Sequence, residues 1–104
     1  MITQNLKEYN STEPSVITVG TFDGIHIGHR EIINELCFIS KKKELKSIIL
    51  SFFPHPKIVL QNSSDIMLIN SMDEKADILN KYNVDCFLIK EFTIEFSIAL
   101  WHIL

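Results

Sequence analysis

The stretch Gly20-Thr-Phe-Asp-Gly-Ile-His-Ile-Gly-His29 decides the fold, because it joins a short apolar run to a helical pattern. The run before it, residues 15–20, is β-branched and ends in glycine, which is typical of a buried strand. From residue 28 to about residue 43, apolar side chains recur at helical spacing, and three lysines then suit the negative end of the helix dipole. The stretch is therefore predicted to be a strand-to-helix turn.

A turn of this composition suits a phosphate group. Gly20, Gly24 and Gly28 allow the backbone to turn tightly and to approach a ligand closely. The N–H groups at the start of a helix have no partner within the helix and favour an anion. His26 and His29 are three residues apart, so both can face one point from the first helical turn. Two imidazoles there can donate hydrogen bonds to a phosphate whose charge grows in a transition state.

Simpler roles remain open for the same residues. A histidine on a helix face is usually structural or solvated, and a glycine usually serves a turn. A zinc site lacks obvious third and fourth ligands in this sequence. Asp23 either caps the helix or orients a histidine.

Two further apolar runs, residues 46–53 and 85–90, also have the character of buried strands. Their hydrophobicity is nearly continuous rather than alternating, which indicates a parallel sheet covered on both faces. The order of strands and helices is that of half a doubly wound, Rossmann-like α/β fold. In such a sheet the first strand is usually central, and here we expect one of its sides to be uncovered.

The remaining segments give a second helix, a long loop and a polar lead. The motif Ser71-Met-Asp-Glu74 is a capping box, and Met72, Ala76 and Leu79 form an apolar stripe up to a stop near Asn83. Residues 54–70 are expected to form a loop with a helical turn near residues 57–60. Residues 1–14 are expected to be a polar lead to a partial domain over residues 15–104.

Composition excludes several classes of protein. The chain has 104 residues and a net charge of −3, and Arg30 is its single arginine, which disfavours a nucleic-acid-binding module. Neither a signal peptide nor a run long enough to span a bilayer is present in the sequence. Cys37 and Cys86 are expected to be free core thiols. We therefore expect a cytoplasmic protein that does not bind membranes.

Two motifs resemble a known family. The segment His26-Ile-Gly-His29 resembles the His-x-Gly-His signature of the nucleotidyltransferase superfamily, which is shared with class I aminoacyl-tRNA synthetases. The full stretch of residues 20–29, together with Phe52-Phe-Pro-His-Pro56, is similar to the FMN adenylyltransferase part of bacterial bifunctional riboflavin kinase/FAD synthetases. Residues 73–76, 84–85 and 91–96 fit the same pattern, so the resemblance runs from about residue 15 to about residue 97.

The resemblance implies an activity, substrates and site residues. AMP would pass from ATP to FMN, giving FAD and pyrophosphate, with Mg²⁺ bridging the ATP oxygens. His26 and His29 would stabilise the negative charge that develops as the terminal phosphate of FMN attacks the α-phosphate of ATP. Because that phosphate is already an anion, the attack would need no general base. The ATP phosphates would be held by Gly20, Thr21, Phe22, Asp23, Gly24 and Gly28. The flavin side would be lined by Pro54, His55, Pro56 and Leu60, although a rigid strand-exit turn is an equal alternative for the prolines and histidine.

The sequence also departs from the family. A later segment with Ser/Thr and Arg that grips the triphosphate, and the riboflavin kinase domain, are not found in it, so kinase activity is not expected. The tail, residues 97–104, does not continue the family pattern and resembles an altered reading frame or an abrupt end. Two hypotheses follow: an FMN adenylyltransferase domain, and a catalytically incomplete fragment that at most binds nucleotide. A nucleotidyltransferase with another acceptor is disfavoured by residues 52–56, and self-association is expected along the uncovered strand edge.

Overall fold

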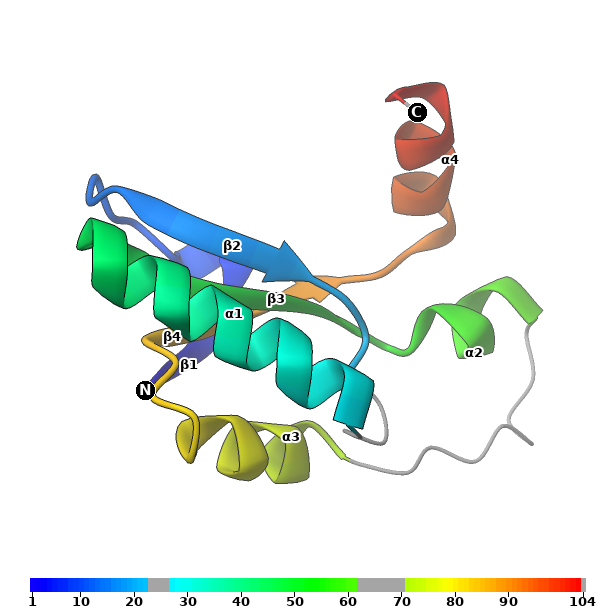
Figure 1. Cartoon of the computed structure of the whole chain (residues 1–104). Helices are drawn as coiled ribbons and strands as arrows, with labels where there is room; N and C mark the ends of the chain where they lie inside the picture. Colours follow the sequence, from blue (N-terminus) through cyan, green and yellow to red (C-terminus); the bar gives the residue numbers. More distant parts are fainter. Residues whose placement is uncertain (23–26, 62–70, 104) are drawn as a thin grey trace.

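All strands of the sheet run parallel, and the three predicted from sequence are confirmed (Figure 1). The computed structural model describes residues 1–22, 27–61 and 71–103. The predicted strands are β2 (Ser15–Val19), β3 (Lys46–Phe53) and β4 (Cys86–Glu91), and the order across the sheet is β1-β4-β3-β2. In the described sheet β2 is therefore an edge strand, with one side unpaired, as expected from the sequence.

Strand β1 (Ile2–Asn5) lies within residues 1–14, which the sequence predicts to be a polar lead. It pairs with β4 in the register Ile2↔Cys86 to Asn5↔Ile89, and a short 3₁₀ helix, η1 (Leu6–Glu8), follows it. This strand is short and largely exposed, so it carries no hydrophobic pattern that would predict it. Its pairing with the buried strand β4 keeps it in the sheet.

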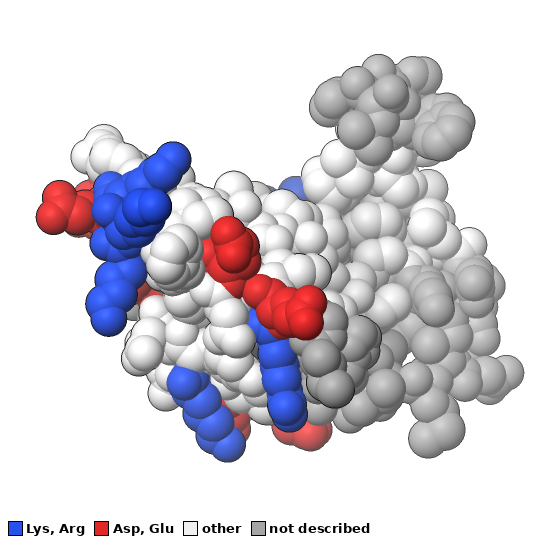
Figure 2. All heavy atoms as spheres, in the orientation of Figure 1, with Lys and Arg blue, Asp and Glu red and all other residues white. Residues whose placement is uncertain are grey.

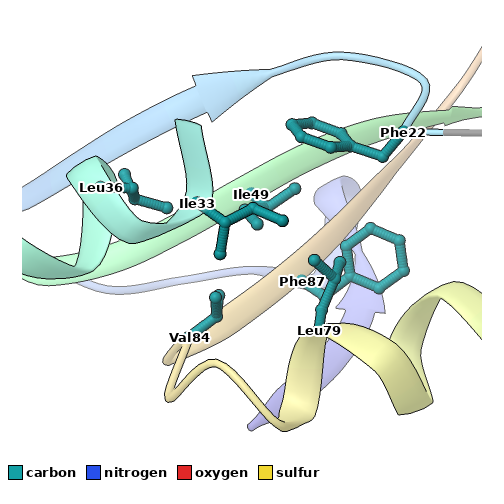
Figure 3. Packing of buried hydrophobic residues seen from close by; sticks show 7 residues of the cluster. All are labelled: Phe22, Ile33, Leu36, Ile49, Leu79, Val84 and Phe87. Atoms are coloured by element: carbon teal, nitrogen blue, oxygen red, sulfur yellow. The ribbon is translucent and has the colours of Figure 1, made fainter. Parts of the chain in front are cut away.

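Two helices cover one face of the sheet. Helix α1 (Ile27–Lys43) and helix α3 (Met72–Asn80) pack their apolar sides on β3 and β4 (Figure 3). The predicted capping box of α3 is present, with both of its hydrogen bonds between Ser71 and Glu74. Each large apolar side chain buried in this way stabilises the folded state by about 1.5–3 kcal/mol. The cluster consists of Phe22, Ile33, Leu36, Ile49, Leu79, Val84 and Phe87.

The opposite face is covered less completely. Ile48, Cys86 and Leu88 form a second buried cluster, against which Leu6 and Tyr9 of the N-terminal segment pack. Nearer the edge, Ile17 and Val19 of β2 are about half exposed, at 51% and 54%. The prediction of two covered faces therefore holds for β3 and β4, whereas β2 keeps much of its apolar surface in solvent.

Two short helices lie beyond the carboxyl ends of the strands (Figure 1). Helix α2 (Pro56–Gln61) contains the predicted helical turn. Helix α4 (Ile94–Ile103) was not predicted, because its sequence is apolar almost throughout and has no clear period. At its start, the hydroxyl of Thr93 accepts a hydrogen bond from the N–H of Phe96 at 3.0 Å, as an N-cap residue does.

Charge on the face drawn in Figure 2 is mixed, with both signs present over the helices. Lysines gather at the end of the molecule where α1 finishes, in agreement with the three lysines of its last turn. Among the described residues, no helix is both long enough and apolar enough to cross a membrane.

Both cysteines are free, as expected from sequence. The thiol of Cys37 donates a hydrogen bond to the carbonyl oxygen of Tyr82 at 2.9 Å, which ties α1 to the turn after α3. Burial, and secondarily the negative charge of Asp85, raises the pKa of the Cys37 thiol. The thiol therefore stays protonated at neutral pH and acts as a hydrogen-bond donor in the core.

Ser47 and Asp85 join the amino ends of β3 and β4. The carboxylate of Asp85 accepts hydrogen bonds from the backbone N–H and the hydroxyl of Ser47, at 2.8 and 3.1 Å. The hydroxyl of Ser47 in turn accepts from the N–H of Asp85 at 2.9 Å. Because Ser47 is buried, these three bonds replace hydration that its polar groups lose on folding.

We predict that Ser47→Ala lowers the free energy of unfolding by about 1–3 kcal/mol, since it removes two of these hydrogen bonds in a buried site. The measurement is urea denaturation followed by circular dichroism. The matched control is Ser15→Ala, at an exposed serine that begins β2. Equal effects of the two substitutions would contradict a structural role for the Ser47–Asp85 pair.

Candidate functional site

The carboxyl ends of β2, β3 and β4 meet at one edge of the sheet, because the three strands are parallel. Hydrogen bonds extend the pairing past the strand ends. The N–H of Gly20 donates to the carbonyl oxygen of Leu50, and the N–H of Phe92 donates to that of Phe53, both at 3.0 Å. In α/β sheets this edge is where ligands bind.

The turn after β2 has a constrained backbone at Gly20–Phe22. Phe22 has a left-handed backbone conformation, with φ of 52°, and its ring is buried. A Cβ atom on Gly20 would lie 3.0 Å from the Phe22 ring, which is closer than such contacts normally come. Glycine at this position therefore allows the phenylalanine ring to fold back beneath the turn.

His29 is the predicted catalytic residue that the structure describes in detail. It lies in the first turn of α1, two residues after Ile27, and it is partly buried. Its ring lies against that of Phe22, with centroids 5.3 Å apart and planes inclined by 48°. The turn and the first helical turn are thus in direct contact through these two side chains.

Three other predicted residues of this turn, Asp23, Gly24 and His26, lie outside the described residues. Gly28 lies in the first turn of α1. The prediction that His26 and His29 face one point therefore stays a prediction. The same holds for the two alternative roles of Asp23.

The exit from β3 brings the predicted flavin-side residues to the same edge. Pro54, His55 and Pro56 are partly buried, and the Phe53–Pro54 peptide bond is cis. Pro56 is the first residue of α2, where its fixed φ suits the helix and its missing N–H has no cost. The carbonyl oxygen of His55 accepts hydrogen bonds from the next turn. Leu60, at 58% exposure, leaves an apolar side chain open to solvent.

Two residues outside the site predicted from sequence contact this turn directly. Lys75 of α3 is buried, and its ammonium group donates a hydrogen bond to the carbonyl oxygen of Thr21 at 2.8 Å. The hydroxyl of Ser51 on β3 donates to the same oxygen at 3.2 Å. A signal was present in the sequence, because Lys75 interrupts the apolar stripe of Met72, Ala76 and Leu79 on the buried side of its helix.

An aromatic cluster stands next to the exit from β3. Phe52, Phe92 and Phe96 lie with their ring centroids 5.6–6.0 Å apart, two of the three pairs edge to face. The ammonium group of Lys90 lies 4.8 Å from the centroid of the Phe96 ring, which is a cation–π distance. The cluster anchors α4 to the ends of β3 and β4.

A hollow of about 340 Å³ lies elsewhere along this edge, between η1 and the ends of β3 and β4. Its lining carries both signs of charge and includes none of the residues predicted for the site. In the described part of the chain, no cluster of three or more His, Cys, Asp or Glu side chains is arranged to hold a metal ion. The described carboxylates therefore do not form a metal centre of their own.

Comparison with known proteins gives one consistent family. The sequence profile of the family described as FAD synthetase matches residues 8–100. A bifunctional riboflavin kinase/FMN adenylyltransferase of Listeria monocytogenes is 35% identical over 83 residues, covering 79% of this chain and 26% of that protein. The protein with the same description from Buchnera aphidicola of Acyrthosiphon pisum is 36% identical over 93 residues, covering 89% and 29%. A protein described as FAD synthetase, also from Listeria monocytogenes, is 36% identical over 84 residues, covering 80% of this chain and 34% of that protein.

The fold has a counterpart among solved structures. A crystal structure described as a macrolide-efflux protein from Streptococcus pneumoniae superposes with a TM-score of 0.79 at 27% identity, covering 93% of this chain and 34% of that one. The chain thus spans between a quarter and about a third of the length of these relatives. With the family profile matching most of its residues, the chain belongs to the FAD synthetase family.

Proposed function

We propose that this chain provides the adenylyl-transfer site of an FMN adenylyltransferase, which moves AMP from ATP to FMN. One observation carries the proposal. The turn at Gly20–Phe22, His29 at the start of α1, and the exit of β3 at Pro54–Pro56 share the carboxyl edge of two adjacent strands. A nucleotide and an acceptor bound at two neighbouring strand ends would meet at this edge.

The ATP side of the proposed site is the turn and the helix start. Backbone N–H groups of a tight turn, with the positive end of α1, favour the phosphates. His29 would donate a hydrogen bond to the α-phosphate as its charge grows, and His26 would act with it. The proposed ATP contacts are Gly20, Thr21, Phe22, Asp23, Gly24 and Gly28.

The reaction needs no base from the protein. The terminal phosphate of FMN is already an anion at neutral pH, so it can attack the α-phosphorus directly. The new P–O bond forms as the bond to the β-phosphate breaks, and pyrophosphate leaves with the electron pair. Mg²⁺ would enter with ATP, held mainly by phosphate oxygens and water, and would neutralise their charge.

The flavin side is proposed at the exit from β3. Pro54, His55 and Pro56 would form a stiff border, and exposed Leu60 would offer an apolar wall to the ring. Phe52, two residues before Pro54, packs its ring against that of Phe96 in α4. A purely structural strand exit is the alternative, and the Leu60 variant below distinguishes the two.

A second candidate function is nucleotide binding without turnover. It requires only the turn after β2 and the start of α1, whereas turnover also requires an acceptor bound at the exit from β3. For the location and other partners, we propose a cytoplasmic protein that binds neither nucleic acid nor membranes, in keeping with its net charge of −3. Self-association along β2 is proposed because this edge strand exposes Ile17 and Val19.

We predict that His29→Ala lowers the turnover of FAD formation on the order of 100-fold, while the affinity for ATP changes far less. The measurement is FAD produced from FMN, ATP and magnesium, separated by chromatography and detected by fluorescence. Asn34→Ala, at an exposed position of the same helix, is the matched control and should leave turnover unchanged.

Three results decide between the candidates. FAD formation that disappears in His29→Ala supports the transferase. ATP binding without FAD formation by the folded chain supports the nucleotide-binding alternative. Equal losses of turnover and ATP affinity in His29→Ala would contradict the transition-state role of this residue.

We predict that Leu60→Ala raises the KM for FMN about three- to tenfold and leaves the KM for ATP unchanged, since it removes apolar contact with the flavin only. Ile2→Ala is the control, at a similarly exposed residue at the opposite end of the sheet. An unchanged KM for FMN would favour the structural interpretation of the β3 exit.

A further inference from the structure

A buried lysine donates a hydrogen bond to a backbone carbonyl oxygen in the turn at Gly20–Phe22, the proposed phosphate site. The Lys75 side chain on α3 is 2% exposed, and its ammonium group is 2.8 Å from the oxygen of Thr21, 54 positions away in the sequence. Lysine is rarely buried to this extent unless its charge is compensated by polar groups. The burial of Lys75 therefore points to a specific role for this hydrogen bond.

The carbonyl oxygen of Thr21 accepts a second hydrogen bond from a residue of the sheet. Ser51 is fully buried on β3, and its hydroxyl donates to the same oxygen at 3.2 Å. Two donors from two different elements thus fix the direction of one carbonyl group. Because the peptide unit is planar and trans, the N–H of Phe22 must point the opposite way, away from the buried side.

This peptide unit precedes the strained residue of the turn. A φ angle of 52° is unfavourable for a residue other than glycine, so the packing around Phe22 must hold this conformation. The ring of Phe22 lies against the ring of His29. A rotation of the Thr21–Phe22 peptide would therefore release both the turn and the contact with His29.

We propose that Lys75 is a positioning residue for ATP binding. Together with Ser51 it keeps the Thr21 carbonyl group pointing into the protein interior. The turn then presents N–H groups, rather than a carbonyl oxygen, to the phosphates. This inference rests on the proposed function, because it assumes that the phosphates bind at this turn. An inward carbonyl also removes a partial negative charge from the anion site. Lys75 acts through the backbone and does not need to touch ATP.

The test is ATP–magnesium binding by titration calorimetry, with thermal unfolding of each variant recorded in parallel. Lys75→Met keeps the length and apolar stem but loses the donor, and we expect its affinity for ATP to fall about tenfold, as for loss of a charge-assisted hydrogen bond. Leu79→Ala, on the buried side of the same helix, should lose as much or more stability with its ATP affinity within about twofold of wild type.

Two serines of β3 provide a matched pair that keeps the proposal testable if Lys75→Met does not fold. Ser51→Ala removes the second donor to Thr21, and we expect about a threefold loss of ATP affinity, as for a neutral hydrogen bond. Ser47→Ala removes hydrogen bonds at the other end of the strand and should leave ATP affinity unchanged.

The outcomes separate this inference from the proposed function. ATP affinity that falls in Lys75→Met and Ser51→Ala, but not in Leu79→Ala or Ser47→Ala, supports the positioning role. Unchanged affinity in folded Lys75→Met, or in Ser51→Ala where the lysine variant does not fold, overturns it while the ATP site stands. A wild-type chain that binds no ATP overturns the proposed function itself, and this is read from the wild type alone.

Discussion

The parallel pairing of β3 between β2 and β4 is the constraint on which the rest of the structure depends. It brings the ends of three strands to one edge, so the turn after β2, the exit from β3 and the start of α4 become neighbours there. The same pairing places the buried serines of β3 on the side that α1 and α3 cover. The Ser47–Asp85 hydrogen bonds close the sheet at its amino edge, and Ser51 reaches the turn at the carboxyl edge.

Packing in the core stabilises the strained backbone of the turn after β2. Phe22 takes a left-handed conformation because its ring is buried in the core that α1 and α3 form with the sheet, and Gly20 leaves room for that ring. The hydrogen bonds that Lys75 and Ser51 donate to Thr21 act on the peptide just before it. A site held by groups from α3 and β3 is therefore coupled to the stability of the whole domain rather than to its loop alone.

Much of the fold could be predicted from the sequence, because continuous apolar runs and helical periods mark β2, β3, β4, α1 and α3. Strand β1 could not, since its four residues are mostly exposed and depend on β4 for pairing. Helix α4 has no amphipathic period, and its position follows from aromatic contacts such as those of Phe96. Of the site, local motifs predicted the turn and His29, whereas Lys75 meets Thr21 only through tertiary packing.

The central claim is that phosphates bind where β2 turns into α1. Amide chemical shifts, recorded as ATP–magnesium is added to isotopically labelled chain, test it most directly. If phosphates bind there, the shifts change most in Gly20–Phe22 and the first turn of α1, and little at the amino ends of the strands around Ser47. Changes centred on Asn5–Glu8 and the hollow beside η1, with the turn unaffected, would contradict it.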